Sequence, residues 1–187
     1  MHRISCNARL TTLFFRGPGV YLDGMNAPLP TPIHFDVQGL VQAIGRNQSA
    51  DVFKPQLNAK QWEMLGSYLQ PFAVRQGQVL IEQNASDRTV YLVESGTLTV
   101  HYEDDKGRLR LASVEGGSAV GEGAFFTRNP RSATVQAASA CKLWSLSPIR
   151  FTELTNRQPA LALEVAMALG SLVSRRLANR PKRVAVT

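Results

Sequence analysis

The sequence predicts a mainly β domain, a sandwich or a jelly-roll barrel, with helices before and after it. The middle of the chain consists of short β-rich runs separated by turn-forming residues, and the segments on either side show helical spacing of apolar residues. The 187 residues, 44% of them hydrophobic, suffice for one domain with a full core. The chain has only two cysteines and three dispersed histidines, which excludes a disulfide framework and a cysteine-ligated zinc site.

The chain before the β region falls into two parts. Residues 1–34 have no sustained period and several prolines, so we expect a poorly structured or extended segment. Residues 35–70 are predicted to form the N-terminal helices. Asn58 can cap the second of these helices, because Gln61 stands at the capping-box offset three residues later.

Residues 71–146 are predicted to form the barrel. Their apolar residues alternate with a period of two, and each run ends at Gly, Asn, Asp or Ser, which is typical of short strands joined by tight turns. Turns are expected at residues 94–96 and 104–107. The predicted strands cover residues 79–81, 90–93, 98–100, 109–111, 133–135 and 143–146.

Residues 147–187 return to a helical period and end in a short basic tail. Ser147 is a natural N-cap and Pro148 suits the first helical turn. A second helix is predicted from Ala160 to Asn179, with apolar residues on more than one side. One stripe can pack on the barrel and the other can meet a partner helix, so a homodimer is predicted. The stripes are Leu161, Val165, Leu169, Leu172 and Val173, and Leu163, Met167 and Leu177.

The net charge of +7 comes from the two ends of the chain. Residues 26–149 hold eleven basic and eleven acidic residues, whereas residues 150–187 hold seven basic and two acidic ones. A basic tail can attract nucleic acid, acidic lipid or an acidic partner, but a solvated helix end is the favoured interpretation. No apolar run has the length of a membrane span or a signal peptide, so a cytoplasmic protein without membrane contact is expected.

One segment, residues 121–135, combines residues suited to binding a phosphate and a sugar. Gly121 and Gly123 open a short helix whose first backbone N–H groups can face an anion. Arg131 can add a forked, charge-assisted contact to anionic oxygens. The carboxylate of Glu122 would repel a phosphate but can accept a hydrogen bond from a sugar hydroxyl. A phosphate joined to a ribose would satisfy both groups.

This segment resembles the phosphate-binding cassette of cyclic nucleotide-binding domains, which occur in catabolite activator proteins, protein kinase regulatory subunits and gated channels. The matching residues run from Gly121-Glu122 to Arg131-Ser132-Ala133-Thr134-Val135 without a gap. Gly77 and the hairpin at residues 91–96 extend the resemblance. The family implies a jelly-roll barrel with a C-terminal lid helix. Val120 and Ser118 depart from it, since an aromatic and an acidic residue are usual there.

The resemblance also implies a role for each matching residue. Glu122 would bind the ribose 2′-OH, and Arg131 would bind the cyclic phosphate together with the backbone N–H groups of Ala124 and Ser132. Arg176 and Arg180 are the candidates for capping the base from the lid helix. The predicted ligand-binding residues are Gly121, Glu122, Gly123, Ala124, Arg131, Ser132 and Ala133.

The sequence therefore predicts a stand-alone regulatory module that binds cAMP, or else cGMP, and signals to an unknown protein effector by a conformational change. The alternative is a scaffold of the same fold that binds no nucleotide and acts through protein contacts. No enzyme activity, metal or cofactor is expected, because clustered histidine and carboxylate ligands of a cupin-like enzyme are missing. Sequence-specific DNA binding is not expected either, since only residues 182–187 follow Pro181.

Overall fold

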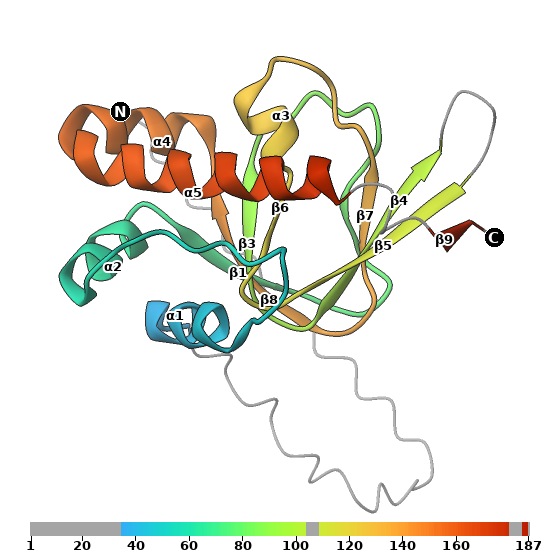
Figure 1. Cartoon of the computed structure of the whole chain (residues 1–187), viewed down its shortest axis with the longest axis horizontal. Helices are drawn as coiled ribbons and strands as arrows, with labels where there is room; N and C mark the ends of the chain where they lie inside the picture. Colours follow the sequence, from blue (N-terminus) through green and yellow to red (C-terminus); the bar gives the residue numbers. More distant parts are fainter. Residues whose placement is uncertain (1–34, 104–108, 180–184, 187) are drawn as a thin grey trace, which may run out of the picture. The chain divides into compact units, whose positions relative to one another are not determined.

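The computed structural model describes residues 35–103, 109–179 and 185–186. In this part of the chain, two antiparallel sheets face each other and helices cover one of them (Figure 1). The predictions for residues 1–34, for the turn at residues 104–107 and for Arg180 lie outside the described residues.

The strand orders combine distant parts of the chain, as in a jelly roll. The first sheet has the order β1-β8-β3-β6 and the second β2-β7-β4-β5-β9. All pairings are antiparallel. The strands are β1 (Gln70–Val74), β2 (Val79–Ile81), β3 (Val90–Ser95), β4 (Thr97–Glu103), β5 (Leu109–Glu115), β6 (Ala119–Val120), β7 (Thr134–Ala137), β8 (Cys141–Leu146) and β9 (Ala185–Val186).

Each of the six predicted runs overlaps a strand, although Ala133 lies just before β7, and the mainly β fold is confirmed. Three strands were not among the predicted runs. Both β6 and β9 have two residues, too few to show a period, and β1 contains Pro71, which weakens a strand pattern. The register of β1 on β8 places Pro71 opposite Trp144.

Two helices begin at the caps that the sequence predicts, and α5 begins at Pro159, one residue before its predicted start. Asn58 Oδ1 accepts a hydrogen bond from Gln61 N, and Gln61 Oε1 accepts one from Asn58 N, both at 2.9 Å. Ser147 caps the next predicted helix and Pro148 is its first residue. The helices are α1 (Val37–Arg46), α2 (Ala59–Gly66), α3 (Glu122–Phe126), α4 (Pro148–Arg157) and α5 (Pro159–Ala178).

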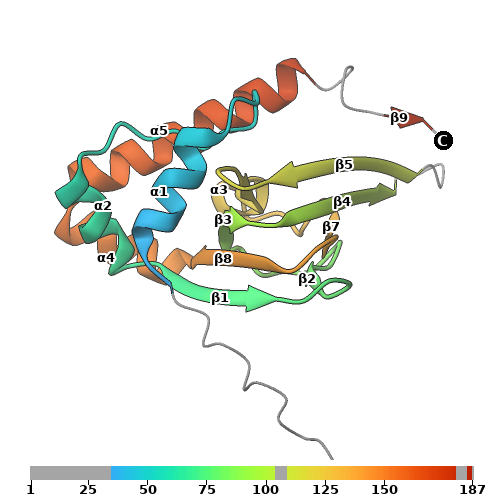
Figure 2. The same cartoon turned by 90° about the horizontal axis from the view of Figure 1, so that it is seen from below.

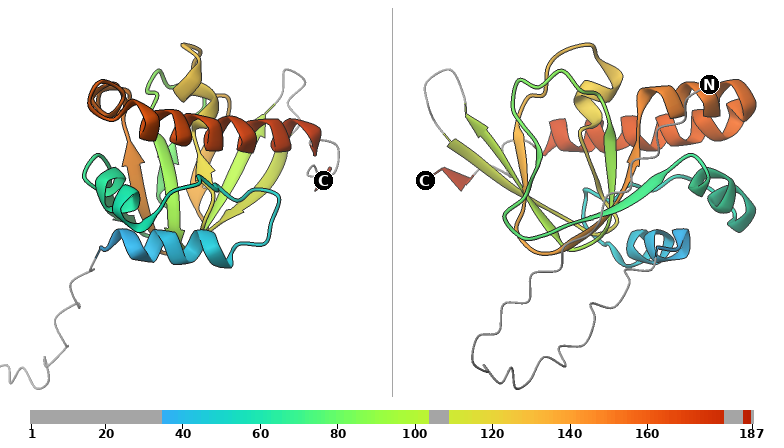
Figure 3. Two further views of the ribbon diagram at one scale, coloured as in Figure 1. Left: turned by 60° about the vertical axis from the view of Figure 1, so that its left-hand side comes forward. Right: turned by 180° about the vertical axis from the view of Figure 1, so that it is seen from behind.

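The core lies in two layers separated by the first sheet. Leu92 packs with the buried faces of the helices, whereas its neighbour Val93 faces the second sheet inside the barrel. Figure 2 and Figure 3 show α1, α2, α4 and α5 gathered on one side of the strands. Leu161, Val165, Leu169 and Leu172 of α5 are buried there, which confirms the predicted inner stripe except for Val173, which is only partly buried. None of the helices in the described ranges is long and apolar enough to cross a membrane.

Candidate functional site

A glycine in the left-handed region starts the cassette. Gly121 has φ +84°, and a Cβ added there would lie 2.5 Å from Arg131 Nη1 and 2.8 Å from the carbonyl oxygen of Thr89. Its carbonyl oxygen accepts the first helical hydrogen bond, from Phe125 N at 3.2 Å. The backbone N–H groups in the first turn of α3 have no acceptor within the helix, because no helical turn precedes them. Such N–H groups are suited to bind an anion.

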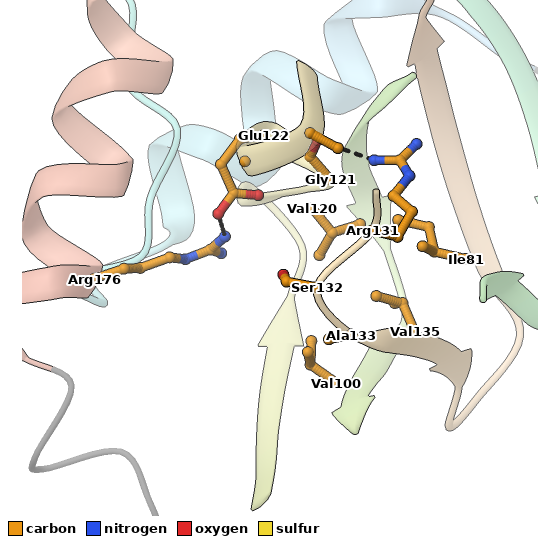
Figure 4. Close-up of a pocket in the computed structure, with 12 residues that line it drawn as sticks. Ile81, Val100, Val120, Gly121, Glu122, Arg131, Ser132, Ala133, Val135 and Arg176 are labelled. Carbon is orange, nitrogen blue, oxygen red and sulfur yellow. Dashed lines mark hydrogen bonds and ion pairs between the residues drawn. The ribbon is translucent and has the colours of Figure 1, made fainter. Parts of the chain in front are cut away.

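The seven predicted ligand-binding residues all line one pocket of about 140 Å³. Arg176, predicted to act from the lid helix, lines it as well, which brings α5 to the cassette. Figure 4 shows the side chains of these residues around the pocket. An apolar wall is supplied by the barrel, as the family resemblance implied, through Ile81, Val100, Val120 and Val135.

Arg131 is a buried cation, only 2% exposed, and four of the five N–H donors of its guanidinium make hydrogen bonds. Its Nε donates to Asp87 Oδ2 at 3.0 Å, and its Nη2 donates to Asp87 Oδ1, so the pair is bidentate. Nη1 also donates to the carbonyl oxygen of Gly121 at 3.0 Å, and Nη2 donates to that of Thr89 at 2.6 Å. Hydrogen bonding to the guanidinium holds the pKa of Asp87 below its ordinary value. The cation is thereby fixed beside the first turn of α3.

Glu122 pairs with the lid helix and not with Arg131. Its Oε1 accepts a hydrogen bond from Arg176 Nη1 at 2.6 Å, and both side chains are mostly buried, at 15% and 17% exposure. Figure 4 shows the Glu122 carboxylate directed toward Arg176, and the Arg131 guanidinium directed toward Gly121. A surface ion pair between Glu122 and Arg131, the simplest structural role for these residues, is therefore not formed.

Three side chains at the site were not among the predicted residues. Asp87 compensates Arg131, while Asp51 and Ser118 contact Arg176, with Asp51 Oδ2 3.6 Å from Arg176 Nε and Ser118 Oγ 3.1 Å from Nη2. Ser118 stands where an acidic residue is usual in the family. This departure was the only feature of the sequence that pointed to any of the three residues. The two aspartates lie in loops without a motif.

Comparison with known proteins agrees with this fold. Residues 71–158 match the cyclic nucleotide-binding domain family, and the match contains the whole cassette. This part of the chain belongs to that family. The cyclic nucleotide-binding domain thus includes β1, apart from its first residue Gln70, through β8 and all of α4, while α5 with Arg176 follows it.

Two curated relatives of the domain are regulators named for cAMP. The chain is 29% identical over 118 residues to a cAMP-dependent protein kinase regulatory subunit of Eremothecium gossypii, covering 63% of this chain and 24% of the relative. It is 31% identical over 107 residues to the cAMP-activated global transcriptional regulator of Salmonella typhimurium, covering 56% and 49%. The chain thus spans a quarter to a half of these relatives.

Solved structures show the same fold. The catabolite activator protein of Thermus thermophilus superimposes with a TM-score of 0.60 at 27% identity, covering 68% of this chain and 58% of that one. A cyclic nucleotide-binding domain from Methylobacillus flagellatus superimposes with a TM-score of 0.65 at 20% identity, covering 80% and 85%. The latter likeness concerns the fold alone.

Proposed function

We propose that the domain binds a cyclic nucleotide, cAMP in the first place and cGMP in the second, and acts as a regulatory module. The observation that carries this proposal is the buried Arg131 guanidinium, fixed beside the first turn of α3 in a pocket that also holds the Glu122 carboxylate. The relatives support it, since they include cAMP-dependent, cAMP-activated and cGMP-dependent proteins.

Each part of the pocket suits one part of the ligand. Arg131 and the amides of Ala124 and Ser132 would neutralise the cyclic phosphate, because a guanidinium and convergent N–H groups are strong partners for anionic oxygens. Glu122 would accept the ribose 2′-OH. The apolar wall of the barrel would contact the base, and Arg176 would close the pocket from α5.

The size of the pocket supports a conformational change on binding. Its volume of about 140 Å³ is below the roughly 300 Å³ at which ligand pockets usually begin. A cyclic nucleotide bound inside this pocket would need more room, and the Glu122–Arg176 pair would pass a movement of the cassette on to α5. A ligand that favours the wider state shifts the population toward it, which a protein effector could detect.

We also propose that α5 forms a homodimer. Ala160, Leu163, Met167, Gly170, Ser174 and Leu177 are exposed and follow one another at intervals of three or four residues. This is the spacing of a coiled-coil seam. Leu163, Met167 and Leu177 are 61–64% exposed, so a stripe of large apolar side chains faces outward. A second copy of α5 has the matching surface, as a twofold interface requires.

Calorimetric titration with cAMP and with cGMP tests nucleotide binding. We expect saturable binding to the wild type, at least a hundredfold loss in Arg131→Ala, and a melting temperature that rises with ligand. Arg128→Ala is the matched control, because Arg128 belongs to the same cassette but is exposed and does not line the pocket. It should bind like the wild type.

Arg131 is buried, so its replacement can also unfold the domain. Arg131→Lys keeps the charge without the forked geometry and should fold better while still binding weakly. A wild type that gives no heat and no thermal shift at millimolar nucleotide contradicts the proposal. The scaffold alternative would then be favoured.

A further inference from the structure

The segment between α1 and α2 (residues 47–58, the connector) is hydrogen-bonded to the end of α5 that reaches the pocket. Arg175 donates hydrogen bonds to the connector carbonyls on either side of Asp51, at 2.8 and 2.6 Å. The next residue, Arg176, has its Nε 3.6 Å from Asp51 Oδ2. Two consecutive arginines therefore hold one short loop, but only Arg176 also touches the cassette.

Each nitrogen of the Arg176 guanidinium faces an acceptor. Nη1 donates to Glu122 Oε1 at 2.6 Å, and Nη2 donates to Ser118 Oγ at 3.1 Å and to the carbonyl oxygen of Ala119 at 2.8 Å. Asp51 faces the third nitrogen, Nε. Because the guanidinium is planar and rigid, holding Nε and Nη2 fixes the direction in which Nη1 points.

This arrangement makes a carboxylate–guanidinium–carboxylate chain that ends at the ligand pocket. The side chains of Asp51, Arg176 and Glu122 are only 14%, 17% and 15% exposed, so the ion pairs are weakly screened. Asp51 is not among the residues that line the pocket. Among the described residues, Glu122 makes no side-chain hydrogen bond other than the one to Arg176 through Oε1. Its Oε2 is therefore available to a ligand hydroxyl.

We propose that Asp51 is a positioning residue for recognition of the ribose. Through Arg176 it holds the Glu122 carboxylate so that one oxygen is occupied and the other receives the 2′-OH of the nucleotide. The inference rests on the proposed function and assigns a residue outside the cassette, from the N-terminal side of the barrel, to that site. A role confined to fastening the connector would give Asp51 no influence on which sugar is bound.

The ratio of affinities for a nucleotide and its 2′-deoxy counterpart tests this role. Calorimetry would compare cAMP with 2′-deoxy-cAMP, or the guanosine pair if cGMP binds more tightly. We expect Asp51→Asn to weaken cAMP binding about three- to tenfold. Binding of 2′-deoxy-cAMP should hardly change, because that ligand has no hydroxyl for Glu122 to hold. Glu122→Gln should lower the ratio at least as much.

Arg175→Ala is the matched control, since it releases the same connector without touching Glu122. Its ratio should equal that of the wild type, even if its melting temperature falls. If Asp51→Asn does not fold, Arg176→Lys interrupts the same chain and should lower the ratio. An unchanged ratio in Asp51→Asn, with a lowered one in Glu122→Gln, overturns the inference and leaves the proposed function intact. An equal fall in Arg175→Ala also overturns it. A wild type that binds neither ligand defeats both proposals.

Discussion

At the scale of single residues, the site depends on how its buried charges are compensated. Arg131 is almost wholly buried, and removing a guanidinium from water is costly unless acceptors replace the water. Asp87 and two carbonyl oxygens supply them. Asp87 is about half exposed, at 48%, so protons from the solvent can reach its carboxylate. The carboxylate that stabilises the buried cation is therefore also one that a change of pH can protonate.

The Asp87–Arg131 pair predicts a pH dependence of stability. Arg131 holds the pKa of Asp87 below its ordinary value, so the folded state binds this proton more weakly than the unfolded chain. The stabilisation is present above the unfolded pKa of about 3.9 and is lost as the pH falls through the lower, folded pKa. We expect the melting temperature of Asp87→Asn to be lower at neutral pH but to fall less steeply than that of the wild type between about pH 5 and 3. Parallel curves for the two proteins would contradict this assignment.

The sequence predicts the cassette better than its surroundings. Gly121, Glu122 and Arg131 were found from the chemistry of a local pattern, because a turn, a helix start and a strand entry are all encoded within fifteen residues. Their partners are distant in sequence: Asp87 is 44 residues from Arg131, and Arg176 is 54 residues from Glu122. Such pairings depend on how the sheets and α5 pack, which no local pattern specifies.

At the scale of the elements, helix starts were predictable because capping is local. The capping box at Asn58 and the Ser147-Pro148 pair both form. Where each helix lies is decided by packing instead. α1 lies close to β3, because Gly39 of α1 leaves room for Glu94 of that strand. The Glu94 carboxylate is held there by Trp144 Nε1 at 2.7 Å.

Two glycines of α1 allow this packing to be measured. A Cβ at Gly39 would lie 2.7 Å from Glu94 Oε1, and Glu94 is only 9% exposed, so it has little room to move. We expect Gly39→Ala to destabilise the protein by about 1–3 kcal/mol through overpacking. Gly45→Ala is the control in the same helix. A Cβ there meets no atom within 4 Å, so higher helix propensity should stabilise the protein by about 0.5–1 kcal/mol.

Urea denaturation of both variants gives the comparison. If Gly39→Ala proves as stable as Gly45→Ala, α1 is not packed against Glu94 as described. The two Gly→Ala substitutions should change the free energy of unfolding in opposite directions. Because both affect the unfolded chain in the same way, this difference separates the effect of packing from that of helix propensity.

At the scale of the whole molecule, α5 has two apolar sides with different uses. Its inner stripe packs with α1 and α2 in one core, and its C-terminal end reaches the pocket beside the cassette through Arg176. Its outer stripe is exposed. A widening of the pocket that moves Arg176 would therefore also move the outer stripe, so that an α5 interface could transmit the state of one pocket to a second copy.

The dimer proposed for α5 predicts the effect of a charge in the outer stripe. Met167 is 61% exposed at the centre of the stripe, so Met167→Lys should cost the folded monomer little but place two lysines together at a twofold interface. Light scattering at tens of micromolar should give the mass of a dimer for the wild type and of a monomer for Met167→Lys. Ile149→Lys is the control, because Ile149 is 80% exposed on α4, outside the stripe, and its variant should remain a dimer. A monomeric wild type, or a dimer that Met167→Lys leaves intact and Ile149→Lys disrupts, would place the interface elsewhere or remove it.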